Sequence, residues 1–199
     1  MRSAPTLETE RLTLRHYRKQ DFRAQLAIVG DDETMRHVGG KGLSEEECWR
    51  RLAASVGMWD LLGFGGWAVV RRADDRLVGL ISLFNGWRAL EPVFGDDPEM
   101  GWIFARSVHG QGIAGEACRA VLDWADATLQ PGPIWAIIAP ENEPSLRLAQ
   151  RLGFETFVTS IYHGDPTIVL KRTRPALLPA AAAATAATTA RRPSAARSA

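Results

Sequence analysis

Apolar and polar residues alternate along residues 11–18, where Leu12, Leu14 and His16 fall on one side of the segment. A period of two is typical of a half-buried strand, so this segment predicts the first strand of a sheet. Apolar residues then recur at helical spacing over residues 21–29 and 44–62. Ser44 followed by Glu47 is a capping-box signature, in which each side chain covers a free amide at a helix start. We therefore expect two helices after the first strand.

Strand-like and helix-like segments alternate through the rest of the chain up to residue 171. Short apolar runs predict strands over residues 65–73, 76–84, 99–105, 134–139, 155–163 and 167–171, and helical spacing predicts helices over residues 114–129 and 142–152. The first two of these strands are joined by Asp74-Asp75 and the last two by Gly164-Asp165-Pro166, so each pair reads as a hairpin. The run at 134–139 is continuously apolar, which fits a central strand covered on both faces. The pattern as a whole predicts an α/β fold with a mixed sheet and helices on both faces.

The composition changes sharply at residue 173. Residues 1–172 have ordinary globular composition and predict one domain, whereas residues 173–199 consist almost entirely of Ala, Thr, Pro, Arg and Ser and predict a disordered tail. The tail holds four arginines and no acid, which leaves 20 basic against 23 acidic residues, a charge of −3, in the predicted domain. A general nucleic-acid binder needs a basic face, so we expect no nucleic-acid partner. The longest apolar stretch, residues 176–190, is interrupted and too short to span a membrane, so we expect no membrane partner either.

The two cysteines, Cys48 and Cys118, lie far apart and inside helical patterns. This spacing indicates neither a disulfide framework nor a zinc site, and we expect a cytoplasmic protein without a metal. The four histidines show no metal-ligand spacing and are interpreted as ordinary strand or loop residues.

A glycine-rich loop, Gly110-Gln111-Gly112-Ile113-Ala114-Gly115, lies between a predicted strand and an amphipathic helix. Its glycines allow a tight backbone turn whose amides point toward an anion near the helix start, so the loop favours a phosphate-bearing ligand. A plain turn without a ligand is the first alternative. The second is a dinucleotide fingerprint, because the loop matches G-x-G-x-x-G. That fingerprint needs an acidic residue about 20 positions on, where Trp135 stands instead, and it normally opens a parallel βαβ series.

Three motifs in the right order carry a resemblance to a known family. They are Glu99-Met100-Gly101-Trp102, the segment from His109 to Ala117, and Asn142-Glu143-Pro144-Ser145 with Leu152-Gly153-Phe154. Together they resemble the GNAT superfamily of acyl-CoA N-acyltransferases, and most closely the branch with the ribosomal-protein N-terminal acetyltransferases. The resemblance covers residues 7–172. It implies a three-layer sandwich with a splayed, largely antiparallel central sheet flanked by helices.

The resemblance implies where the cosubstrate acetyl-CoA binds. Its pyrophosphate would sit on the amides from Gly110 through Gln111, Gly112, Ile113 and Ala114 to Gly115. Its pantetheine arm would run along strand 99–105 beside Trp102, and amides near Ile103 and Phe104 would hold the thioester carbonyl. Asn142 would orient the arm or the sulfur.

Direct attack on a thioester needs a neutral amine, so a group must accept its proton. Glu99 is the candidate base, acting through water; a surface glutamate at a strand start is the plain alternative. Ser145 is the candidate acid for the leaving thiolate, by resemblance to the N-terminal acetyltransferase branch. The plain alternative is that Asn142 caps a helix and Ser145 completes its first turn.

The sequence therefore predicts an N-acetyltransferase that moves acetyl to a primary amine, either a protein N-terminus or a small molecule. The first alternative is a noncatalytic acyl-CoA-binding regulatory module, and the second, which the sequence favours less, is a dinucleotide-binding oxidoreductase. The tryptophans are interpreted as mostly core residues, although Trp59, Trp67 and Trp87 could line an acceptor pocket. Three loop acids could attract a cationic acceptor or merely solvate the loop: Glu91, Asp96 and Asp97. A homodimer is compatible with the resemblance, because members of the family often pair.

Overall fold

The alternating segment near the N-terminus folds as strand β2, which joins a sheet that runs across the whole molecule. The structure is a computed structural model and describes residues 2–174. The strands are β1 (Leu7–Glu8), β2 (Leu12–Arg15), β3 (Gly66–Arg71), β4 (Arg76–Phe84), β5 (Glu99–Phe104), β6 (Pro133–Ile138), β7 (Glu155–Tyr162) and β8 (Asp165–Thr173). The helices are α1 (Phe22–Val29), α2 (Asp32–Met35), α3 (Glu45–Leu62), α4 (Ile113–Thr128) and α5 (Glu143–Arg151), with short 3₁₀ turns at Lys19–Asp21 and Arg106–Val108.

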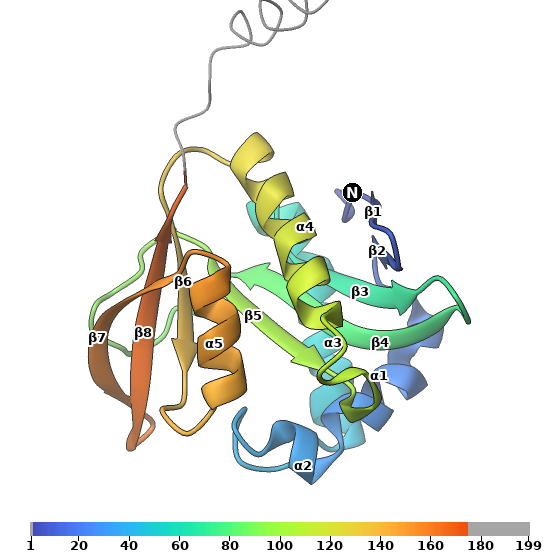
Figure 1. The fold of residues 1–199 in the computed structure, drawn as a ribbon, viewed down its shortest axis with the longest axis horizontal. Helices are drawn as coiled ribbons and strands as arrows, with labels where there is room; N and C mark the ends of the chain where they lie inside the picture. Colours follow the sequence, from blue (N-terminus) through green and yellow to red (C-terminus); the bar gives the residue numbers. More distant parts are fainter. Residues whose placement is uncertain (1, 175–199) are drawn as a thin grey trace, which may run out of the picture.

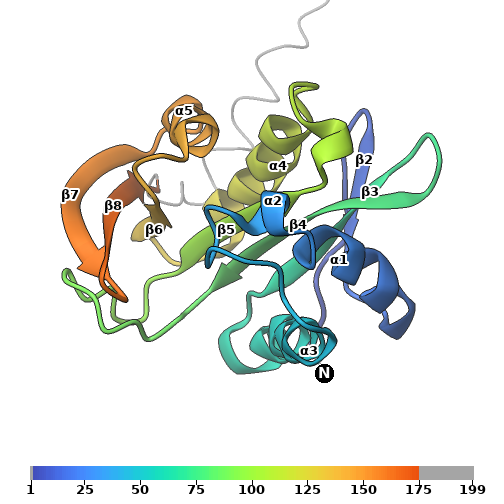
Figure 2. The ribbon, with the colours of Figure 1, turned by 90° about the horizontal axis from the view of Figure 1, so that it is seen from below.

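Within residues 2–174 the strands form one sheet in the order β1-β2-β3-β4-β5-β6-β8-β7. Every neighbouring pair is antiparallel except β5 and β6, which are parallel. Figure 2 shows α4 and α5 over one face of the sheet and α1 and α3 under the other. The predicted mixed sheet with helices on both faces is confirmed.

Each face of the sheet has its own hydrophobic core, and β5 contributes to both. Met100 belongs to the core on one face, together with Val121 of α4. Ile103 belongs to the core on the other, together with Leu52 of α3. Side chains of a strand alternate between faces, so a strand covered on both sides is apolar along its length. This double burial fixes β5 in place at the centre of the sheet.

The sheet divides where β5 meets β6. The two parallel strands pair at a single position, Glu99 with Trp135, where the Trp135 amide donates to the Pro98 carbonyl at 2.9 Å. Beyond this point β6 pairs along its whole length with β8, while β5 stays with β4. Figure 1 shows the two strands separating into a V with α4 and α5 beside the opening. The splayed, largely antiparallel sheet implied by the resemblance is therefore present.

Most element boundaries agree with the sequence pattern. The capping box of α3 forms as predicted, since Ser44 Oγ accepts from the Glu47 amide and the Glu47 carboxylate accepts from the Ser44 amide. The strand predicted over residues 11–18 corresponds to β2 and is shorter than predicted. After Arg15 the chain enters a 3₁₀ turn held by Asp21. Helix α2 was not predicted, because four residues are too few to show a periodicity.

The predicted domain boundary at residue 172 is close to the end of the sheet. Strand β8 runs to Thr173, one residue further. The predicted disordered tail lies, from residue 175 onward, outside the described residues. Along residues 2–174 the helices fall short of the length and apolar character that crossing a membrane requires.

Candidate active site

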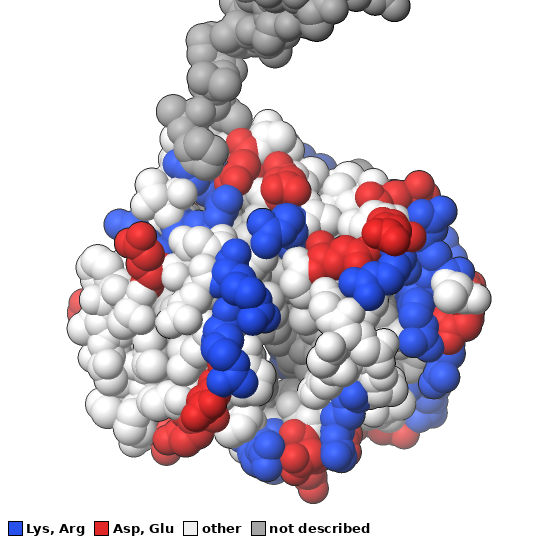
Figure 3. Space-filling view, viewed as in Figure 1, with Lys and Arg blue, Asp and Glu red and all other residues white. Residues whose placement is uncertain are grey.

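The opening between β5 and β6 continues into a pocket of about 600 Å³. This volume lies in the range of small-molecule sites, roughly 300–1,000 Å³. In Figure 3 the hollow lies beside α5 and is bordered there by a column of basic side chains; α5 itself carries the exposed Arg147 and Arg151. The walls come from five parts of the chain: residues 36–40 with Arg51, residues 84 and 88, residues 99–103, residues 137–145, and residues 162–167.

The peptide groups of β5 face alternately into the opening and toward β4. Pro98 accepts from β6, while the Ala105 amide donates to Val78 of β4 at 2.9 Å. Since the backbone direction alternates along a strand, the peptide groups of Trp102 and Phe104 turn toward the opening. The peptide group of Ile103 turns instead toward β4, where Ile103 is paired with Leu80. An extended ligand lying in the opening would therefore meet the amides of Trp102 and Phe104.

The glycine loop follows β5 directly and has the conformation that its sequence indicates. Gly110 has φ 73° and Gly112 has φ 75°, in the left-handed region where only glycine is free of strain. A Cβ at Gly110 would meet nothing within 4 Å, so the backbone conformation, and not crowding, requires glycine there. Helix α4 begins at Ile113 without a side-chain cap. Its first-turn amides are thus free to bind an anion.

A clamp from the segment between β1 and β2 holds the glycine loop in position. The Arg11 guanidinium donates to the Gln111 carbonyl at 2.9 Å and to the Glu116 carboxylate at 2.6 Å, and Thr9 also donates to Glu116. Burial acts to raise the pKa of Glu116, but hydrogen bonds from Thr9 and Arg11 outweigh it and lower the pKa. Arg11 therefore balances an acidic charge that would otherwise repel a phosphate from the start of α4.

The glycine loop and Glu99 lie at opposite ends of β5. Glu99 is the first residue of the strand, and the loop begins after residue 109, beyond its last residue, Phe104. Six residues of extended strand span about 20 Å. A ligand that uses both sites must therefore be long and thin, with an anionic end on the loop and its other end beside Glu99.

Glu99 lies at the closed end of the V and is 3% exposed. Both of its carboxylate oxygens accept from Arg88, at 2.6 Å from Nε and 2.8 Å from Nη2. Burial raises the pKa of Glu99, and Arg88 only partly offsets that effect. Arg88 is itself held over the ring of Tyr162, with 4.8 Å between the guanidinium carbon and the ring centre. Glu99 is thus a buried carboxylate, and a plain surface glutamate is excluded.

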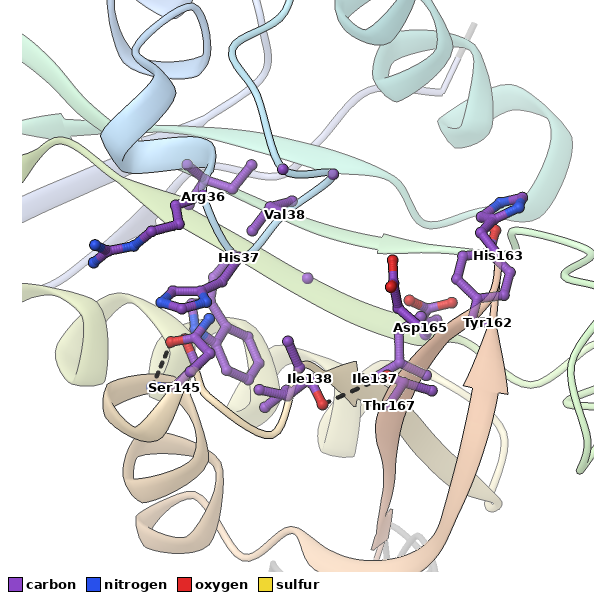
Figure 4. A pocket seen from close by; sticks show the side chains of 18 of the residues that line it. Arg36, His37, Val38, Ile137, Ile138, Ser145, Tyr162, His163, Asp165 and Thr167 are labelled. Atoms are coloured by element: carbon purple, nitrogen blue, oxygen red, sulfur yellow. Dashed lines mark hydrogen bonds between the residues drawn. The ribbon is translucent and has the colours of Figure 1, made fainter.

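Asn142 and Ser145 stand at the start of α5 and line the same pocket. Asn142 Oδ1 accepts from the Ser145 amide at 3.3 Å, so Asn142 does cap the helix. Figure 4 shows Ser145 with His37 turned toward it from the loop after α2. Capping by the Asn142 oxygen leaves its amide nitrogen and the Ser145 hydroxyl available to a ligand.

The structure adds pocket residues that the sequence pattern did not single out. His37 and His163, interpreted from sequence as ordinary loop residues, both line the pocket, and so do Arg88 and Tyr162. Figure 4 shows Tyr162 and His163 together at the far side from His37. No short motif marks these residues, because they come from separate loops that only the folded chain brings together.

The interpretation of the tryptophans as core residues is confirmed for Trp59 and Trp67, and none of Trp59, Trp67 and Trp87 is among the residues that line the pocket. Trp59 and Trp67 are 2% and 0% exposed and pack edge to face with Trp124 inside the core. Trp87 is 74% exposed and borders a separate small depression. The large apolar side chains of Trp59 and Trp67 are stabilised by burial in the core, as is common for tryptophan.

The loop acids Glu91, Asp96 and Asp97 likewise lie outside the pocket wall. Asp97 instead accepts a hydrogen bond from the Trp135 indole at 3.4 Å. The structure therefore gives no support to these acids as the attraction for a cationic acceptor.

Comparison with known proteins gives a consistent result. A family model described as an acetyltransferase (GNAT) domain matches residues 11–155. The uncharacterized N-acetyltransferase YnaD of Bacillus subtilis is 26% identical over 148 residues, which make up 74% of this chain and 81% of the relative.

Solved structures agree with that match. A protein of Bordetella pertussis assigned to the GNAT-family acetyltransferases has a TM-score of 0.76 at 30% identity, covering 85% of this chain and 100% of the other. RimL, a ribosomal L7/L12 α-N-protein acetyltransferase solved in complex with coenzyme A, has a TM-score of 0.69 at 16% identity, covering 85% and 98%. At that identity the likeness to RimL concerns the fold alone.

Proposed function

The chain belongs to the GNAT family of acetyltransferases, and from this premise we propose that it transfers acetyl from acetyl-CoA to a primary amine by direct attack on the thioester. The single observation that carries the proposal is that the glycine loop and a buried carboxylate lie at the two ends of β5, whose edge between them is open. Acetyl-CoA has the shape that this path requires, with phosphates at one end and a thioester at the other.

The glycine loop would hold the pyrophosphate through the amides from Gly110 to Gly115. Support comes from the left-handed glycines and from the uncapped start of α4. The amides of Trp102 and Phe104 face the opening and would pair with the pantetheine arm or donate to the thioester carbonyl. Donors fixed in this way stabilise the negative charge that develops on the carbonyl oxygen during acyl transfer. The Ile103 amide does not take part in holding the thioester carbonyl in this proposal, because its peptide group is turned toward β4.

Glu99 would accept the proton of the attacking amine, through a water molecule. Its burial supports this role, because a raised pKa makes a carboxylate a stronger base. Arg88 is a positioning residue, since its two hydrogen bonds fix the plane of the carboxylate. Each carboxylate oxygen still has a lone pair for a water molecule.

Ser145 would donate a proton to the departing thiolate of coenzyme A, with Asn142 orienting the pantetheine arm. Both residues line the pocket at the start of α5, and the α5 amides would add to the stabilisation of the developing thiolate. We also propose that the protein acts in the cytoplasm, because its cysteines, Cys48 and Cys118, are buried and unpaired.

Calorimetric titration with acetyl-CoA and, separately, with a nicotinamide dinucleotide tests the cosubstrate. We expect saturable binding of acetyl-CoA alone; binding of the dinucleotide alone would refute the proposal. A second assay follows release of the coenzyme A thiol as amines are added. Amine-dependent release separates an enzyme from a noncatalytic acyl-CoA-binding module, which would bind the cosubstrate without turnover.

A further inference from the structure

The pocket has one basic side chain whose charge is not balanced by an ion pair. Arg88 is paired with Glu99, and Arg36 is paired with Glu33 and points away from the pocket in Figure 4. Arg51 also lines the pocket, yet within residues 2–174 no carboxylate lies at ion-pair distance from it. A guanidinium keeps its charge at neutral pH, so Arg51 presents an unmatched positive charge to the contents of the pocket.

Arg51 is held against the sheet by its place on α3. Cys48, one turn earlier on the same face of the helix, is fully buried in the core under the sheet. The Arg51 side chain lies between the pocket and a small cavity beneath it, which Tyr17 also lines. Arg51 is solvent-exposed at the pocket surface. Desolvation by the protein atoms around its guanidinium and the like charge of Arg88 lower the pKa of Arg51. An anion beside Arg51 would offset both effects.

The corner around Arg51 also has hydrogen-bonding capacity that the described chain does not use. Gln25 of α1 is 2% exposed and lines the small cavity, and within residues 2–174 its Oε1 has no hydrogen-bond partner. Ser55 and Ser82 line the same cavity. Buried polar groups are normally satisfied, so an unmet one beside an unmatched cation indicates a place where water or a polar ligand belongs.

We propose that Arg51 binds a carboxylate of the acceptor, so that the acceptor is a small amine that also carries a carboxylate, as an amino acid does. This inference rests on the proposed function. Arg51, Arg88 and Glu99 line the same pocket, and Arg88 is hydrogen-bonded to Glu99. The carboxylate site and the base therefore face one cavity, which suits a small molecule that carries both the amine and the carboxylate.

A guanidinium binds a carboxylate through two parallel hydrogen bonds, which neither an amide nor an ammonium group can accept in the same way. Arg51 would thus favour amino acids over their carboxamides and would disfavour diamines. The same charge gives the amine a fixed orientation, with its nitrogen toward Glu99. Arg51 is a specificity-determining residue in this proposal and takes no part in proton transfer.

The test compares acceptors that differ only in the anionic group. Thiol release is measured with the common α-amino acids, β-alanine and γ-aminobutyrate, with the carboxamide of each, and with putrescine as a diamine. Each is run at several pH values to correct for the different pKa values of the amines. The variants are Arg51→Gln, Arg51→Lys and the control Arg50→Gln. Arg50 is the adjacent arginine, and it faces away from the pocket and pairs with Glu46.

The wild-type protein is expected to use at least one amino acid with a kcat/KM about 10-fold or more above that of its carboxamide. Arg51→Gln should lower kcat/KM for that amino acid by a similar factor and leave its carboxamide within about threefold. The KM for acetyl-CoA should not change, Arg51→Lys should retain part of the preference, and Arg50→Gln should match the wild type.

Three results would overturn the inference: equal use of amino acids and carboxamides, preference for putrescine, or an Arg51→Gln variant that loses both classes of acceptor equally. Acetyl-CoA binding without turnover of any amino acid would overturn it as well. Failure to bind acetyl-CoA at all is a different outcome, because it would refute the proposed function itself.

Discussion

Replacing Glu99 by glutamine removes the carboxylate charge while keeping the shape of a side chain that is 3% exposed. One hydrogen bond from Arg88 can remain, because the amide keeps one oxygen acceptor, and the other is lost. Loss of a charge-assisted hydrogen bond costs about 1.5–3 kcal/mol. The substitution also removes the free-energy cost of burying a charge. The raised pKa of Glu99 indicates that this cost is larger than the stabilisation that Arg88 gives to the carboxylate.

The two effects should largely cancel in the free energy of unfolding. We expect Glu99→Gln to change stability by about 1 kcal/mol or less, which in a domain of this size shifts the melting temperature by about 2–4 °C. Turnover should fall by about 10²–10⁴-fold, the usual contribution of a general base. The substitution therefore separates catalysis from folding, which calorimetric melting and thiol release measure independently.

The pH dependence makes the test sharper. Glu99 acts as a base only when ionised, so wild-type kcat/KM should fall as the pH drops through its raised pKa, and Glu99→Gln should lack this limb. The fall in kcat/KM that reports Glu99 should occur at the same pH for every acceptor, whereas a fall that reports protonation of the amine should shift with the pKa of that amine. Glu141→Gln, in the same pocket wall, is the matched control. A folded Glu99→Gln protein with wild-type turnover and an unchanged acid limb would refute the assignment.

Three other predictions concern separate parts of the molecule. Ser145→Ala should lower kcat by about 10-fold or more in thiol release if its hydroxyl protonates the thiolate, and wild-type turnover in a folded variant would eliminate that role. Gly112→Ala strains a residue at φ 75° by about 1–2 kcal/mol and should weaken acetyl-CoA binding in calorimetry, whereas Gly95→Ala, also left-handed at φ 60° but outside both the loop and the pocket wall, should not. Asp21→Asn should destabilise the fold by about 3 kcal/mol in urea unfolding at pH 7, because it leaves the largely buried Arg15 without its partner. Burial acts to raise the pKa of Asp21, but hydrogen bonds from Arg15 and the backbone outweigh it and lower the pKa. The stabilisation is therefore present above about pH 4 and should be lost as the pH falls through the lowered pKa. A variant that lost as much stability as the wild type over this pH range would contradict the prediction.

Local signals in the sequence were sufficient for most of the secondary structure. Ser44 and Glu47 marked the start of α3, and the break at Pro131-Gly132-Pro133 marked the end of α4, because caps and breakers act within a few residues of themselves. The conformation of the glycine loop could also be predicted from sequence, since Gly110 and Gly112 adopt the left-handed backbone for which glycine is suited.

Signals that depend on environment were less reliable. Trp59 and Trp67 are in the core, as the main interpretation had it, but Trp87 is 74% exposed. A tryptophan in the sequence gives no indication of which face it occupies until the neighbouring elements are in place. The motif Glu99-Met100-Gly101-Trp102 marked Glu99 as a candidate, yet nothing in it indicated that Arg88, eleven residues earlier, would bind both carboxylate oxygens.

The sequence by itself determined the order of strands and helices, the glycine loop and the family resemblance, which also implied that the sheet opens between strands 99–105 and 134–139. Periodicity, caps and glycine conformations are local properties of the chain. Only the tertiary structure decided which peptide groups of β5 face that opening, and that Arg51, which has no ion-pair partner within residues 2–174, lines the same pocket as the Arg88–Glu99 pair. These features depend on strand register and on contacts between residues far apart along the chain. Such contacts exist only once the two cores have formed on the two faces of the sheet.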